Sequence, residues 1–99
     1  MSVASILVDA INSGGGRKRA QATVSIVDDQ GNQVANATVT GDFRGDFNEP
    51  GLSQDTDGSG AALFTGSDTK KGRTTFEFCV TGVTHDTLDP LLDEVCAPY

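Results

Sequence analysis

The sequence predicts an antiparallel β-sandwich, in which two sheets of about seven short strands pack face to face. Three observations favour this fold class. Apolar and polar residues alternate in several segments, glycine and aspartate mark the turns between those segments, and no helical period is long enough to be significant. Seven such strands in 99 residues are typical of a sandwich, and a β-barrel is the main alternative. This length predicts a single domain over residues 1–99.

The first two strands are expected at residues 3–10 and 20–27. The first is almost entirely apolar and carries one charge, Asp9. In the second, Ala22, Val24 and Ile26 share one face and polar residues share the other, as the period of two in a strand requires. The loop between them, 13–18, is rich in glycine but lacks the spacing of a phosphate-binding loop. We expect it to be flexible.

The third strand is expected at residues 34–40, with Ala35, Ala37 and Val39 pointing inward. It follows the sequence DDQGN, a turn in which aspartate starts the reversal and the glycine accepts a positive φ. A polar loop comes next, and Phe43 and Phe47 are expected to anchor this loop to the core.

A short fourth strand at residues 52–54 leads into the sequence DTDGSG, residues 55–60. This hexapeptide is similar to the first half of an EF-hand loop, whose twelfth position is a bidentate glutamate. Here that position is Gly66, so a plain tight turn is expected. The fifth strand follows at residues 61–65.

The last two strands, 74–83 and 91–97, hold both cysteines of the chain. Phe76, Phe78 and Val80 share the inner face of the first, so Cys79 should lie on the outer face. In the second strand Cys96 should lie on the outer face, while Val95 and Ala97 point inward. If these strands form a hairpin that turns near residues 87 and 88, the cysteines are directly opposite, within disulfide range.

A Cys79–Cys96 disulfide is therefore expected, and closing this loop should contribute about 3 kcal/mol to stability. Two free thiols and a zinc site are the alternatives. Zinc needs four ligands and commonly uses a close cysteine pair, which this segment lacks. The single histidine, His85, is expected to be an exposed loop residue. A disulfide is typical of an oxidising compartment, so we expect a secreted or cell-surface protein.

Composition narrows the function classes. A net charge of −7 argues against nucleic acid as a partner, and no apolar stretch approaches the roughly 20 residues of a membrane span. No arrangement of nucleophile, acid and base indicates an enzyme. A signal peptide is not recognisable, so we expect a domain excised from a larger secreted protein.

The alternating strands should sort the charged loops to opposite ends of the sandwich. One end should gather all the basic residues, which are Arg17, Lys18, Arg19, Arg44, Lys70, Lys71 and Arg73. Four acidic residues at the same end, Asp42, Asp46, Glu49 and Asp68, should dilute this charge. The other end should gather acidic residues, among them Asp28, Asp29, Asp55, Asp57 and Asp86. Solvated loops would explain both groups. The functional alternatives are an anionic polysaccharide or extracellular protein at the basic end and calcium at the acidic end.

Two runs carry a resemblance to a known family. The run ATVSIVDDQGNQVANATVTGDFRGDF, followed by DTDGSGAALFT, resembles bacterial Ig-like domains. The ending FEFCVTGVTH…LDEVC is similar to Ig-like accessory domains at the C-termini of secreted bacterial hydrolases, subtilisin-like peptidases among them. The resemblance covers about residues 20–97. It implies an Ig-like sandwich.

The resemblance also implies a function: a non-catalytic module that serves attachment, spacing or interaction beside a catalytic domain of the parent chain. The alternative is a calcium-assisted carbohydrate-binding module. Such modules commonly use aromatic platforms, and this chain has one tyrosine and no tryptophan, so we rank that alternative second.

Overall fold

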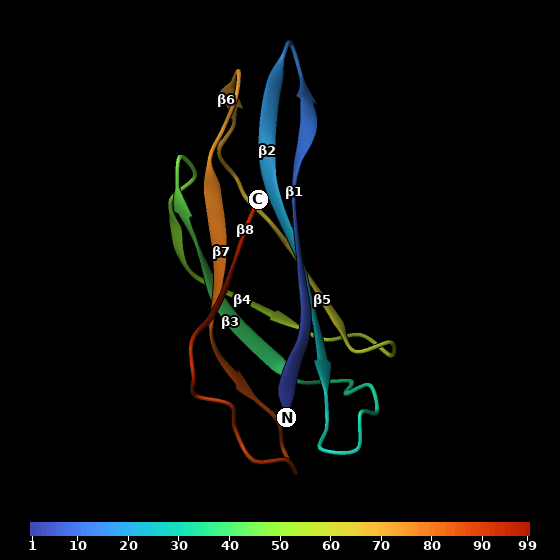
Figure 1. Cartoon of the computed structure of the whole chain (residues 1–99). Coiled ribbons are helices and arrows are strands. Elements are labelled where there is room, and N and C mark those ends of the chain that lie inside the picture. Colours follow the sequence, from blue (N-terminus) through green and yellow to red (C-terminus); the bar gives the residue numbers. More distant parts are fainter.

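The structure is a computed structural model that describes residues 1–99 as eight β-strands and no helix. The strands are β1 (Ser2–Gly14), β2 (Arg17–Val27), β3 (Thr38–Gly45), β4 (Glu49–Asp55), β5 (Ala61–Thr65), β6 (Lys70–Lys71), β7 (Phe76–Thr84) and β8 (Val95–Pro98). One antiparallel sheet contains β1, β2 and β5 in that order, with β6 also paired to β2, and the other has the order β4-β3-β7-β8. The predicted two-sheet β-sandwich is confirmed (Figure 1). The chain has no helix that could cross a membrane.

The core lies between the two sheets and contains fifteen buried apolar residues. The face of β2 predicted to be buried, formed by Ala22, Val24 and Ile26, is fully buried. Aromatic rings join the layers. The ring of Phe78 on β7 lies 4.9 Å from that of Phe43 on β3 and 4.7 Å from that of Phe64, which belongs to β5 in the opposite sheet.

The first hairpin is longer and tighter than the sequence predicts. β1 pairs with β2 as far as Gly14 opposite Arg17. The turn uses Gly15 and Gly16 at φ values of 61° and 75°, a backbone conformation that costs other residues energy. The expectation of a loop over residues 13–18 is therefore wrong, because three consecutive glycines permit a close turn and both strands continue to it.

The third strand begins at Thr38, four residues later than predicted, and continues to Gly45. Asn36 has a φ of 62°, which breaks the extended run before Thr38. Thr56 then fixes the segment: its Oγ1 accepts the Ala37 N–H at 2.9 Å and donates to the Val34 carbonyl at 2.7 Å.

This break changes which side chains of the segment enter the core. Val34 is buried there, whereas Ala35 is only half-buried, so the inward prediction for Ala35 is wrong. Ala37 is buried as predicted, and so are Val39 and the two anchoring phenylalanines, Phe43 and Phe47.

The last hairpin confirms the predicted pairing. Cys79 lies directly opposite Cys96 in the register of β7 and β8, and their sulfur atoms form a disulfide. The strand β8 is shorter than predicted, since it begins at Val95 and Leu91 makes only an isolated bridge to Val83.

Three details of burial in this hairpin differ from the prediction. Cys79 is fully buried although it lies on the outer face, because Asp42 of β3 and Cys96 of β8 flank it on both sides. Val95 is exposed where an inward position was expected, because it opens a four-residue edge strand. His85 is half-buried and its Nε2 lies 3.1 Å from the Ala35 carbonyl oxygen, so it packs against the chain where an exposed histidine was predicted.

Candidate functional site

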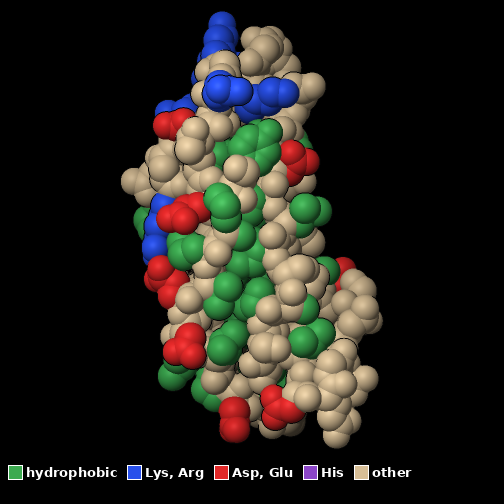
Figure 2. Space-filling view, viewed as in Figure 1, with side chains coloured by type: hydrophobic (Ala, Val, Ile, Leu, Met, Phe, Trp, Pro, Cys, Tyr) green, Lys and Arg blue, Asp and Glu red, His purple; other side chains and the backbone are tan.

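Basic side chains gather at the end of the sandwich formed by the β1–β2 turn and β6. The short strand β6 pairs with the start of β2, so that Arg17 lies opposite Lys71 and Lys18 opposite Lys70. The space-filling view shows Lys and Arg side chains concentrated at this upper end, whereas Asp and Glu side chains are spread from just below it to the lower end (Figure 2). We call the group at the upper end the basic end; its members are Arg17, Lys18, Arg19, Lys70, Lys71 and Arg73.

No carboxylate of the chain forms an ion pair with a member of the basic end. The structure contains three ion pairs, and none of them involves a member of this group. Neutral oxygens hold several of its side chains in place. Arg17 Nε donates to Thr69 Oγ1 at 2.7 Å, Arg19 Nη1 donates to the Gly66 carbonyl at 2.7 Å, and Lys18 Nζ donates to Asn12 Oδ1 at 2.8 Å. None of these three hydrogen bonds is to a carboxylate.

Arg44, the seventh basic residue, is in a different situation. Its guanidinium pairs with Asp42 at 3.0 Å and with Glu94 at 2.8 Å. Hydrogen bonding to Arg44 is the main cause that lowers the pKa of Glu94. The Gly51 N–H is the main cause that lowers the pKa of Asp42, and Arg44 adds to it. Two carboxylates thus compensate Arg44, and it joins β3 to the segment before β8.

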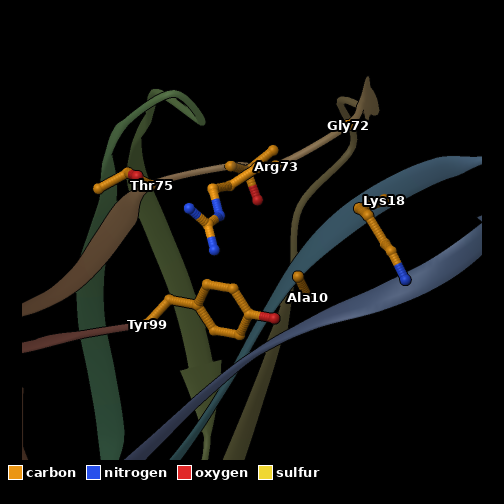
Figure 3. A pocket seen from close by; sticks show the side chains of 7 residues that line it. Ala10, Lys18, Gly72, Arg73, Thr75 and Tyr99 are labelled. Carbon is orange, nitrogen blue, oxygen red and sulfur yellow. The ribbon is translucent and has the colours of Figure 1, made fainter.

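A cavity of about 510 Å³ opens beside the basic end (Figure 3). Three parts of the chain line it: the β1–β2 hairpin with Ala10 and Lys18, the connection from β6 to β7 with residues 72–75, and Tyr99 after β8. Arg73 and Lys18 are its two cations, and none of its lining residues is acidic. Figure 3 shows the Arg73 guanidinium pointing toward the ring of Tyr99, whose hydroxyl points toward Ala10.

Tyr99 is the functional candidate that the sequence prediction misses. Its N–H donates to the Phe76 carbonyl at 3.0 Å, which continues the pairing of β8 along β7. Its ring stacks on that of Phe76, with centroids 5.1 Å apart and planes 19° apart. The residue nevertheless remains 56% exposed. The one sequence signal was its position two residues after the last predicted strand, and that gives no indication of a cavity.

The acidic residues at the opposite end do not converge. Asp28 and Asp57 each bind backbone N–H groups of their own turns: Asp28 those of residues 30 and 32, and Asp57 those of residues 59 and 61. Asp55 Oδ1 accepts the Thr38 hydroxyl at 2.8 Å, and an oxygen of Asp29 lies 3.8 Å from the N-terminal amine.

The ligand geometry of calcium is therefore not formed by these residues. Neither Asp86 nor any other acidic residue of this end is part of a group of three ligand atoms within 4.8 Å of one another. The one such group in the chain is Glu77 with the two cysteines, and its sulfurs are bonded to each other. The structure places the five predicted residues Asp28, Asp29, Asp55, Asp57 and Asp86 in separate turns and strand ends.

Turn capping by Asp57 should make stability depend on pH. Hydrogen bonds from Ser59, and then from the Ala61 N–H, lower the pKa of Asp57 in the folded protein. A carboxyl group with a lowered folded pKa stabilises the fold above its unfolded pKa, and this contribution disappears as the pH falls through the folded value. Stability should therefore decrease below about pH 4.

The variant Asp57→Asn keeps the acceptor oxygen but does not titrate. Its melting temperature, followed by circular dichroism from pH 6 to pH 2, should decline less steeply in the acidic range than that of the parent. An equally steep decline in both proteins would show that this carboxylate does not contribute. Asp89→Asn is the control, since Asp89 is an exposed carboxylate outside this turn.

Comparison of the chain with protein-family models, with curated proteins and with solved structures yields no match. The features of the molecule that bear on its function are therefore the sandwich, its disulfide and the chemistry of its basic end.

Proposed function

We propose that this chain is a non-catalytic accessory module of an extracellular bacterial hydrolase, and that it attaches the neighbouring catalytic domain to an anionic target. The resemblance described above suggests the context. The disulfide supports an extracellular location, because such bonds persist in oxidising compartments. A rigid sandwich that presents side chains from loops and turns suits attachment.

The observation that carries this proposal is the uncompensated basic end. The chain has twice as many acidic as basic residues, 14 against 7, yet six of the seven basic residues share one end and have no carboxylate partner. A concentrated positive patch on an otherwise acidic protein orients the molecule in the field of a negative surface and speeds association. The acidic end should then point away from the target.

Binding to an immobilised polyanion tests the proposal. The protein should be retained on an insoluble carboxylated polysaccharide such as cross-linked pectate, released by salt, and not retained on neutral cellulose. Lys70→Gln/Lys71→Gln should weaken retention roughly fivefold, which corresponds to about 1 kcal/mol.

The control is Gln30→Glu/Gln33→Glu, two exposed positions at the acidic end. Each double variant lowers the net charge by two, from −7 to −9. Only the double lysine variant changes the basic end. Retention of the control should match that of the parent. Equal weakening of both variants, or retention of the parent that salt does not affect, would contradict attachment through the basic end.

The calcium-assisted carbohydrate-binding module is not put forward as a second candidate. It would need oxygen ligands that converge on one point, and the acidic side chains bind their own turns.

A further inference from the structure

The cavity beside the basic end has the size and chemistry of a site for one unit of a larger ligand. Its volume of about 510 Å³ lies within the range of about 300–1,000 Å³ that is common for small-molecule sites. It is built where three segments meet: the β1–β2 hairpin, the β6–β7 connection and the chain after β8.

One cation at the cavity, Arg73, faces Tyr99 and is available to a ligand (Figure 3). Arg73 takes part in none of the three ion pairs of the structure. It follows Gly72, whose φ of 80° allows the sharp turn that directs Arg73 into the cavity. Lys18 contributes to the wall of the cavity, but its Nζ donates to Asn12 Oδ1 at 2.8 Å and points away from Arg73 and Tyr99 (Figure 3). A planar guanidinium binds both oxygens of a carboxylate at once.

The aromatic wall of the cavity suits a ring with apolar faces. Phe76 covers one face of Tyr99 and holds it in place, while the exposed part of Tyr99 borders the cavity. Hydroxyl groups complete the lining, from Thr74, Thr75 and Tyr99 itself. A rigid aromatic ring offers a large contact area at a low cost in conformational entropy.

We propose that this cavity binds a uronic acid unit of an acidic polysaccharide, with the sugar ring against Tyr99 and its carboxylate at Arg73. Cations without an aromatic wall would suit a simple inorganic anion, and an aromatic wall without cations would suit a neutral sugar. The combination favours a carboxylated ring with hydroxyl groups. This inference depends on the proposed attachment function, and it adds the ligand class and the residues that select it.

The test uses titration calorimetry with a trimer of galacturonic acid and with the matching neutral galactose trimer. The acidic trimer should bind, and the neutral trimer should bind at least about tenfold more weakly, because a charge-assisted bidentate contact is lost. Arg73→Gln should also reduce affinity for the acidic trimer about tenfold.

Lys71→Gln is the matched control for Arg73→Gln. It removes the same charge from the same end, but Lys71 does not line the cavity, so affinity should change no more than about twofold. Tyr99→Ala should weaken binding of both sugars, whereas Tyr99→Phe keeps the ring and should retain binding of the acidic trimer. Melting curves should show that each of these variants of exposed residues is folded.

The results of these experiments distinguish failure of the cavity proposal from failure of the attachment proposal. If Arg73→Gln and Lys71→Gln weaken binding equally while the protein still binds pectate, the cavity proposal is overturned and attachment by the basic end stands. A sulfated trimer that binds as tightly as the uronate would overturn selection of a carboxylate. If the parent protein binds neither the trimer nor pectate, both proposals are wrong.

Discussion

Replacing Phe78 with alanine should destabilise the protein by about 3–5 kcal/mol, the cost of a large aromatic truncation in a core. Phe78 is fully buried and its ring contacts Phe43 in its own sheet and Phe64 in the opposite sheet. It also covers Gly41, where an added Cβ would lie 2.5 Å from its ring carbon Cζ. No neighbouring side chain at Gly41 can therefore fill the space that the ring leaves.

Urea denaturation followed by fluorescence or circular dichroism measures this loss. Small domains are commonly stable by only about 5–15 kcal/mol, so Phe78→Ala could leave little folded protein. Phe78→Leu, which removes less volume, should then show a smaller loss of about 1–2 kcal/mol.

Leu63→Ala is the control for this substitution. Leu63 is a large apolar residue on β5 next to Phe64, but it is exposed, and its truncation should cost less than about 1 kcal/mol. If Leu63→Ala costs as much as Phe78→Ala, the assignment of the core is wrong.

Removing the disulfide with Cys79→Ala/Cys96→Ala should lower the free energy of unfolding by about 3 kcal/mol, chiefly because the unfolded chain regains the freedom of a closed loop. The bond spans 17 residues and fastens the four-residue strand β8 to β7. The strand β8 lies at the edge of its sheet and pairs only with β7, so this edge should also become more mobile in the folded protein.

If β8 is released from β7, ligand binding should weaken even while the rest of the protein stays folded. This effect distinguishes the release of β8 from a general loss of stability. Tyr99 reaches the cavity only because β8 lies along β7. We therefore expect the double alanine variant to bind the uronate trimer more weakly even at temperatures where it is fully folded. Reduction of the parent protein should have the same effect, and reduction of the variant should have none. Unchanged unfolding free energy in the variant would contradict this account.

Much of the fold could be predicted because apolar and polar residues alternate along the strands. The buried faces at Ala22, Val24 and Ile26 and at Phe76, Phe78 and Val80 follow directly from a period of two. With both strands of the last hairpin placed, the pairing of the cysteines followed from the register. The sorting of basic loops to one end followed from the alternation of strand direction.

The parts that could not be predicted depend on contacts distant in sequence. The break before β3 requires the hydroxyl of Thr56, eighteen residues beyond Thr38. The two-residue strand β6 has no pattern of its own and exists because it pairs with β2. Likewise, Tyr99 becomes part of a cavity only when β8, β7 and the first hairpin come together.

The two chain ends leave the molecule in very different surroundings. The amine of Met1 lies beside Asp29 at the acidic end, whereas Tyr99 borders the cavity in the upper half of the view (Figure 1). A polypeptide joined after Tyr99 would emerge at the mouth of the cavity and could cover it, whereas one joined before Met1 would leave it open. Tags, linkers and fluorophores for any ligand study therefore belong at Met1, and a bulky C-terminal fusion offers a direct way to obstruct entry.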